Sequence, residues 1–330
     1  MVAAPKCISR PKMTSRNLDS RQIHTDAVLL AILGFAPAIL FSVMEIAVPL
    51  YSIFSLLTVA ALMCAVKLKN IKLLVIFLAL YGLTWMNNVT KSSILTTCLA
   101  LLIGYEHYFV KTKKQRRKFF VLCGLALLIV LFSFTFANQL RGTKTAESQL
   151  AYYTKYGDVS WNGNAAFFMP YMYLETPWAN LQYVMQTQNV RTNGLWLIKP
   201  LINYVQIDKW FASEYVLVPM SSFNTYTYIA CQFKDFGLIG SAFSSILLGI
   251  FVKFVYSRYK ISQDPLDAAC YVYTAQAVLE MFFSNHFFQQ SYPITIVLLL
   301  LLYRWSLSIW MKKNSKYSRT PISMECRSKR

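Results

Sequence analysis

The segment FNTYTYIACQFKDFGLIGSAF, residues 223–243, begins with polar and aromatic residues and ends as the start of an apolar run. The residues after Asp235 have the composition of a helix that enters a bilayer. Asn224, Lys234 and Asp235, by contrast, carry polar groups that the hydrocarbon core strongly disfavours. The segment therefore predicts a junction between a membrane span and a polar compartment, with polar and aromatic side chains held at the mouth of the span.

The whole chain has the composition of a membrane protein. Of its 330 residues, 56% are hydrophobic and only 14% are charged, which is fewer charges than a soluble domain of this size carries. Several apolar runs reach the roughly 20 residues that cross a bilayer core. These runs lie near residues 27–44, 47–66, 71–89, 92–110, 119–137, 236–256, 267–285 and 293–311. We therefore expect an all-α polytopic membrane protein with about eight transmembrane helices.

The positions of the basic residues predict the topology. The formal net charge is +19, and 24 of the 33 lysines and arginines lie in the two terminal segments and in three links between the apolar runs. The links are residues 67–72, 111–118 and 253–260. This alternation follows the positive-inside rule if both termini are cytoplasmic. The basicity therefore reports topology in the plasma membrane, and we expect no nucleic-acid partner.

We expect one integral membrane domain over residues 1–330. Its parts are a cytoplasmic N-terminal segment 1–26, spans within 27–137, an extracytoplasmic loop 138–235, spans within 236–311 and a cytoplasmic tail 312–330.

The loop 138–235 is the main extramembrane part. It holds four of the seven tryptophans and ten of the 21 tyrosines. Such rings suit either a membrane interface or a groove that stacks on sugar faces. Its two arginines are Arg141 and Arg191, and an arginine fork binds a phosphate or diphosphate with two parallel hydrogen bonds. Arg141 follows a span directly, so contact with a lipid headgroup is the alternative there.

Two ionisable residues near the outer end of one span need an explanation. Glu280 is placed inside an apolar run, where a carboxylate is usually paired or functional. His286 is the one histidine expected on the outer side. The outer acidic residues form no DxD or similar cluster, so we expect no metal site and no cofactor.

Small residues recur after Asp235, at Gly237, Ser241, Ser245 and Gly249. This spacing of four predicts a helix face on which a neighbouring helix can pack closely. The helix end before it is expected to offer free N–H groups and a positive dipole to an anion.

Two motifs resemble those of the Wzy-type polymerases of O-antigen, capsule and exopolysaccharide repeat units. The first is FNTYTY at 223–228, followed by DFG at 235–237 and by Gly240, and the second is YLETPWANL at 173–181. The resemblance implies a membrane glycosyltransferase that moves a growing glycan from undecaprenyl diphosphate onto a new lipid-linked repeat unit. It also implies undecaprenyl-diphosphate-linked oligosaccharides and the lipid bilayer as partners, with a flippase and a chain-length regulator of the same pathway.

The site residues follow from this resemblance together with the residue chemistry. We expect Arg141 and Arg191 to bind the diphosphate, and His286 or Glu280 to act as the base. The residues expected to contact the substrate are Tyr173, Asn224, Tyr226, Tyr228 and Asp235.

Other functions remain as alternatives. An O-antigen ligase-like transferase would carry a His-Asn pair, but Phe223 occupies the histidine position and the distance to Gly237 is longer. A polysaccharide or lipid-carrier transporter is disfavoured because the chain has no internal repeat and few charges within its spans.

Overall fold

The computed structural model of the chain describes residues 20–43, 51–83, 91–140, 160–187, 191–195, 226–262 and 264–282, with a few single positions between 147 and 155. The principal elements within these ranges are all α-helices. They are α1 (Ser20–Val43), α2 (Tyr51–Lys67), α3 (Ile71–Leu83), α4 (Lys91–Phe109), α5 (Lys113–Leu140), α7 (Ala165–Thr187), α9 (Tyr228–Ile261) and α10 (Pro265–Leu279). The all-α prediction is confirmed for the described part of the chain.

The helices α1 to α5, α9 and α10 each overlap one of the first seven predicted apolar runs, and the run 293–311 lies outside the described residues. Two helical stretches, Gln22–Leu40 and Tyr228–Ile261, are long and apolar enough to cross a membrane. Three further apolar helices are shorter: Leu56–Lys67, Ile71–Leu83 and Ile94–Phe109. The eight-span count stays a prediction. The helix α7 falls within the predicted outer loop and is an element that the apolar runs do not predict.

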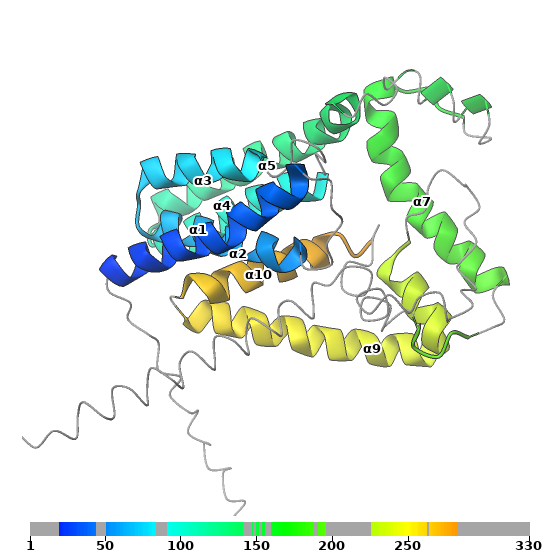
Figure 1. Ribbon diagram of the computed structural model, residues 1–330. Coiled ribbons are helices and arrows are strands. Elements are labelled where there is room, and N and C mark those ends of the chain that lie inside the picture. Colours follow the sequence, from blue (N-terminus) through cyan, green and yellow to red (C-terminus); the bar gives the residue numbers. More distant parts are fainter. Residues whose placement is uncertain are drawn as a thin grey trace, which may run out of the picture.

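The centre of the bundle is α2, which contacts α1, α3, α4 and α10 (Figure 1). Every residue from Thr58 to Ala65 is at most 1% exposed. A helix that is surrounded by protein on all sides needs no polar face, and the sequence of α2 contains few polar residues. The bundle is therefore organised around one helix that is apolar on every side.

A glycine brings α1 against α2. A Cβ atom at Gly34 would lie 2.8 Å from the backbone N of Thr58 and 3.1 Å from the carbonyl carbon of Leu57. Real Cβ atoms essentially never come that close to backbone atoms, so the two helices could not approach this closely with a larger residue at that position. The close contact of α1 with the central helix therefore depends on Gly34.

The C-terminal end of α9 is fixed by charged groups. The Tyr259 hydroxyl donates a hydrogen bond to the Glu106 carboxylate, and Lys260 Nζ lies 2.9 Å from the same carboxylate. Arg258 Nε lies 3.0 Å from Asp267 Oδ1 on α10, and the Asp267 side chain is 4% exposed. These contacts tie α9 to α4 and α10 at one end of the molecule.

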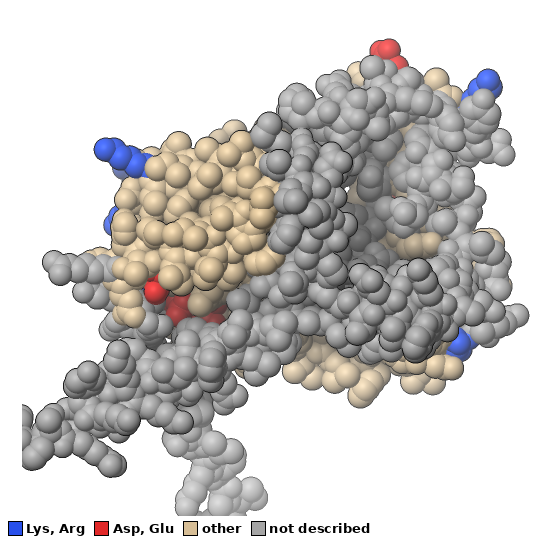
Figure 2. Space-filling view, in the orientation of Figure 1, with Lys and Arg blue, Asp and Glu red and all other residues tan. Residues whose placement is uncertain are grey.

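The outer sides of several helices are apolar and exposed. Ile32 on α1 is 62% exposed, Phe120 on α5 is 65% exposed and Ile239 on α9 is 87% exposed. Figure 2 shows the described side of the bundle as a continuous surface without charged groups, with charged side chains only at its margins. Such a surface is costly in water and suits contact with hydrocarbon.

The approach of α1 to α2 can be tested with two glycine variants. We expect Gly34→Ala to lower the melting temperature of the detergent-purified protein, because overpacking costs about 1–3 kcal/mol. The matched control is Gly124→Ala on α5, where a Cβ would meet no described atom within 4 Å. This control should leave the melting temperature equal or higher, since alanine favours a helix by about 1 kcal/mol over glycine. Equal stability of the two variants would contradict the close packing.

Candidate functional site

The helix α9 is broken at Gly237. This residue has φ 70° and ψ −167° inside an element that is otherwise helical from Tyr228 to Ile261. A positive φ of this size is readily adopted by glycine and strains other residues. In an unbroken helix, the carbonyls of Phe233 and Lys234 would accept hydrogen bonds from the N–H groups four residues later. The break therefore leaves carbonyls near Phe233 and Lys234 to be paired from elsewhere.

A segment distant in sequence supplies that pairing. Arg191 Nη1 donates to the Phe233 carbonyl at 2.6 Å, and the Thr192 backbone N–H donates to the Lys234 carbonyl at 3.2 Å. The Thr192 hydroxyl also donates to the Asp235 carboxylate, which is 1% exposed. A cation at this position is favourable because the carboxyl end of a helix carries partial negative charge. The segment 191–195 thus caps the first part of α9.

The capping segment ends in a tight turn. Asn193 has φ 50° and Gly194 has φ 93°, and the Leu195 N–H donates to the Thr192 carbonyl at 3.1 Å. Two consecutive positive φ angles favour an Asn-Gly pair. The Phe236 ring lies 3.5 Å from the place where a Cβ of Gly194 would be. The Asn-Gly dipeptide is thus a signal in the sequence from which this turn could have been predicted.

The guanidinium group of Arg191 is stacked as well as hydrogen-bonded. It lies 4.5 Å from the centroid of the Phe233 ring, and the residue is exposed. A guanidinium carries five N–H donors, and one of them makes the bond to Phe233. The cation is therefore held in orientation at the surface of the break. The diphosphate role expected for Arg191 stays a prediction, and its capping role is a finding that the sequence did not predict.

The break also explains why glycines recur in DFGLIG. A Cβ at Gly240 would lie 2.1 Å from Cβ of Phe236, because the chain does not advance by a regular turn between them. The hydroxyl of Ser241 donates to the Gly237 carbonyl at 2.6 Å, and that of Ser245 donates to the Ser241 carbonyl at 2.7 Å. These contacts are local to α9.

The prediction of a helix-packing face along these small residues therefore has to be corrected. Gly237 is not helical, and a Cβ at this position would lie 3.4 Å from the guanidinium of Arg191. A Cβ at Gly249 would meet no described atom within 4 Å. The interpretation of these small residues as one close-packing face is wrong for Gly237. At Gly249, no neighbouring helix packs closely within the described residues. The spacing of four arises from a break and from serine hydroxyls that bond to the helix backbone.

The start of α9 differs from the expectation too. The helix begins at Tyr228, so Lys234 and Asp235 lie inside it. The Thr227 hydroxyl accepts from the Ala230 N–H at 3.1 Å, and the Tyr228 N–H donates to the Met281 carbonyl at 2.8 Å. At the helix start that the structure has, the N–H groups of Tyr228 and Ala230 are thus already hydrogen-bonded, and the anion site expected just before Gly237 stays a prediction. The start of α9 is instead tied to the chain that follows α10.

The two tyrosines at this start are buried. Tyr226 is 8% exposed and Tyr228 is 2% exposed. Burial raises the pKa of Tyr226 to about 12, so its phenol stays protonated at any physiological pH. In this conformation both rings support packing. Their contact with a glycan stays a prediction.

The helix α7 is buried along one face, and its C-terminal part packs on this start. The buried side chains recur every four positions, as one helix face requires. They are Phe168, Met172, Thr176, Asn180 and Val184. Val184 forms a cluster with Tyr226, Ala230 and Cys231, against which Leu181 and Phe233 pack. The two quoted motifs, 173–181 and 223–240, are therefore brought together, and Tyr173 is a residue of α7.

One buried polar side chain at the site, Gln232, has no hydrogen-bond partner among the described residues. Gln232 is 0% exposed, and neither its Nε2 nor its Oε1 has a hydrogen bond within the part of the chain that the structure describes. Leaving a buried amide unpaired costs about 1–3 kcal/mol, so such a group calls for an explanation, such as a functional role, strain or a bound water. Gln232 was not among the predicted site residues, since one glutamine in a helix carries no pattern.

Glu280 lies at the C-terminal end of α10 and is 2% exposed. Gln276 Nε2 donates to its carboxylate at 3.4 Å, and Gln276 Oε1 accepts from the Thr96 hydroxyl at 2.5 Å. These bonds connect α10 to α4 through buried polar groups. The next residue, Met281, is the one that accepts from Tyr228. Glu280 is thus next in sequence to a residue that contacts the start of α9, and its carboxylate is covered.

Three predicted site residues, Arg141, Asn224 and His286, lie outside the described residues. Among the residues that are described, no group of three His, Cys, Asp or Glu side chains is arranged to hold a metal ion. Metal independence stays a prediction.

Comparisons with protein-family models, with curated proteins and with solved structures gave no match. The functional inference therefore rests on the residues of this chain.

The break can be tested by removing its glycine. We expect Gly237→Ala to lower the melting temperature, because the φ and ψ of this position are essentially restricted to glycine and cost another residue about 1–3 kcal/mol, and a straightened helix loses the contacts to Arg191 and Thr192. Gly249→Ala in the same helix is the control, since its Cβ meets no described atom, and it should be neutral or stabilising. A Gly237→Ala protein as stable as the control would show that the break is dispensable.

Proposed function

We propose that the chain is a membrane glycosyltransferase of the Wzy type, which polymerises undecaprenyl-diphosphate-linked oligosaccharide repeat units into O-antigen, capsule or exopolysaccharide. The observation that carries this proposal is the meeting of the two resembling segments at the start of α9, just before its break. Leu181 and Val184 pack there with Tyr226 and Ala230, and the exposed guanidinium of Arg191 stacks on Phe233 of the same cluster.

The proposal includes an eight-span topology in the plasma membrane, with both termini cytoplasmic and α7 on the outer side. The residues after the break, 238–261, would extend about 36 Å at 1.5 Å per residue, enough to cross a core of about 30 Å. The residues before the break then stand at the outer boundary of the membrane. The basic links and the exposed apolar sides of α1, α5 and α9 support this arrangement.

The proposed glycosyl transfer requires that the leaving group be stabilised. The donor lipid departs as a diphosphate, so its negative charge must be met by fixed donors near the outer membrane surface. Arg191 is suited to this, because stacking on Phe233 and the bond to its carbonyl fix the plane of the guanidinium. The donors that this bond does not use are then available to phosphate oxygens in a fork. Arg141 would complete the clamp.

The acceptor sugar needs orientation and a base for its hydroxyl proton. Gln232 offers an amide donor and an amide acceptor without partners among the described residues, which fits contact with a sugar hydroxyl once the site opens. Of the two candidate bases, Glu280 is covered and hydrogen-bonded to Gln276. The bond to Gln276, which in turn bonds to Thr96, gives Glu280 a structural part in holding α10 on α4, and His286 is then our candidate for the base.

The test is polymerisation by purified protein from lipid-linked repeat units. We expect Arg191→Lys to slow polymer formation about ten- to hundred-fold, since a lost charge-assisted hydrogen bond is worth roughly 1.5–3 kcal/mol. The rate is measured per folded molecule, with the melting temperature recorded for each variant, because Arg191 also caps α9. The matched control is Lys155→Ala, which removes an exposed cation of the same outer segment and should retain activity.

Two results would contradict the proposal. If wild-type protein produces no ladder of lengthened products, the chain is not a polymerase, and transfer onto an acceptor other than a repeat unit would favour the ligase alternative. If Arg191→Lys is as active as Lys155→Ala, the diphosphate is bound elsewhere.

A further inference from the structure

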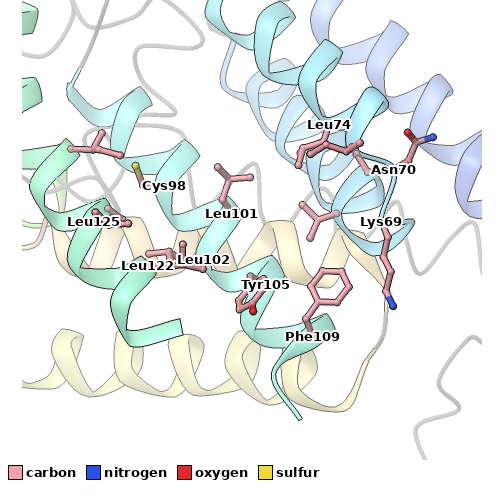
Figure 3. A pocket seen from close by; sticks show the side chains of 15 residues that line it. Lys69, Asn70, Leu74, Cys98, Leu101, Leu102, Tyr105, Phe109, Leu122 and Leu125 are labelled. Atoms are coloured by element: carbon pink, nitrogen blue, oxygen red, sulfur yellow. The ribbon is translucent and has the colours of Figure 1, made fainter. Parts of the chain in front are cut away.

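A cavity of about 460 Å³ is lined by residues of α2, α3, α4 and α5 and of the turn between α2 and α3 (Figure 3). Its volume is in the range of small-molecule sites. Side chains of α4 such as Leu101, Leu102 and Tyr105 line it, together with Leu74 of α3 and Leu122 of α5. The walls are almost entirely apolar, so the cavity suits a hydrocarbon chain.

One end of this cavity is polar and cationic. Lys69 and Asn70, in the turn between α2 and α3, line that end, and Figure 3 shows them apart from the leucines of α4 and α5. Lys69 has φ 56° and is exposed, and its ammonium lies 5.3 Å from the centroid of the Phe109 ring. Asn70 Oδ1 accepts from the Leu73 N–H at 3.1 Å and so caps α3. The turn holds its lysine at the mouth of the cavity.

More positive charge gathers at the same end. Phe109 also lines this end, and the link KTKKQRRK, residues 111–118, begins two residues later and has all of its cations exposed. The nearby acid on α4, Glu106, is paired with Lys260 at 2.9 Å. The mouth therefore combines a basic rim with an apolar interior.

We propose that this cavity binds one acyl chain of an anionic phospholipid, whose phosphate lies against Lys69 and the basic link 111–118. The positive-inside topology places this end at the cytoplasmic leaflet, where anionic headgroups attract such clusters. A second copy of this chain fits poorly as the occupant, because its cytoplasmic segments carry the same positive charge. The inference rests on the membrane topology and is independent of polymerase activity.

The test is retention of lipid by the purified full-length protein after delipidation and exposure to vesicles of phosphatidylglycerol or of phosphatidylcholine, read by native mass spectrometry. Wild-type protein should retain one phosphatidylglycerol more strongly than phosphatidylcholine. Lys69→Ala should reduce that preference about five-fold, since a cation near an anionic surface contributes about 1 kcal/mol. Lys155→Ala should leave it unchanged.

The cavity itself is tested by filling it. Ala126 lines the cavity on α5, and its neighbour Leu127 does not line it and is 60% exposed. Ala126→Trp should abolish retention of the lipid, whereas Leu127→Trp should keep it. Equal retention of the two lipids by wild-type protein, or unchanged retention by Ala126→Trp, would overturn the proposal.

If Ala126→Trp does not fold, a second measurement on wild-type protein tests the proposal instead. Wild-type protein is irradiated with phosphatidylglycerol that carries a diazirine in its acyl chain, and the labelled peptides are identified. Labelling concentrated on α4 and on the 122–129 part of α5 supports the proposal. Labelling spread evenly over the exposed sides of α1 and α9 contradicts it.

Discussion

The candidate site depends on one backbone break. Gly237 interrupts α9, and the carbonyls of Phe233 and Lys234 accept hydrogen bonds from Arg191 and Thr192 across a long separation in sequence. Unpaired carbonyls in a buried or membrane-boundary position are costly, so the segment 191–195 is held where it can pair them. The same contacts fix the direction of the Arg191 guanidinium. A backbone requirement of α9 thus positions the exposed cation on which the proposed chemistry relies.

The opposite end of α9 has a different kind of anchor. There Lys260 and Tyr259 bind Glu106, and Arg258 binds Asp267. The bundle around α2 joins the two ends, because α10 packs against α2, α4 and α9, and Met281, two residues after α10, accepts a hydrogen bond from the start of α9. The site is therefore built on the edge of a packed bundle, while the proposed lipid cavity uses another face of the same bundle.

Much of the helical content could be predicted from the sequence. Apolar runs such as 119–137 and 236–256 have no polar face, and they fall inside α5 and α9. The helix α7 was harder to predict because Pro170, Pro177 and many aromatic residues give it the composition of a loop, although its buried residues repeat every four positions.

The site was less predictable, for reasons of geometry. A glycine with positive φ looks in sequence like any glycine of a helix, so the spacing around Gly237 predicts a packing face that the structure does not have. The residue type of Arg191 and its place in the loop single it out, but its pairing with the Phe233 carbonyl is a contact between distant segments that no local pattern encodes. Gln232 is notable only because the fold buries it without a partner among the described residues.

The most direct test of the proposed function is the lipid-linked glycan content of cells that lack this chain. If the chain polymerises repeat units, its removal should abolish long polymer and leave single repeat units accumulated on undecaprenyl diphosphate. Restoring the wild-type chain should bring the polymer back. Polymer of normal length in the deletion strain, or loss of polymer without accumulation of single lipid-linked units, would contradict the account.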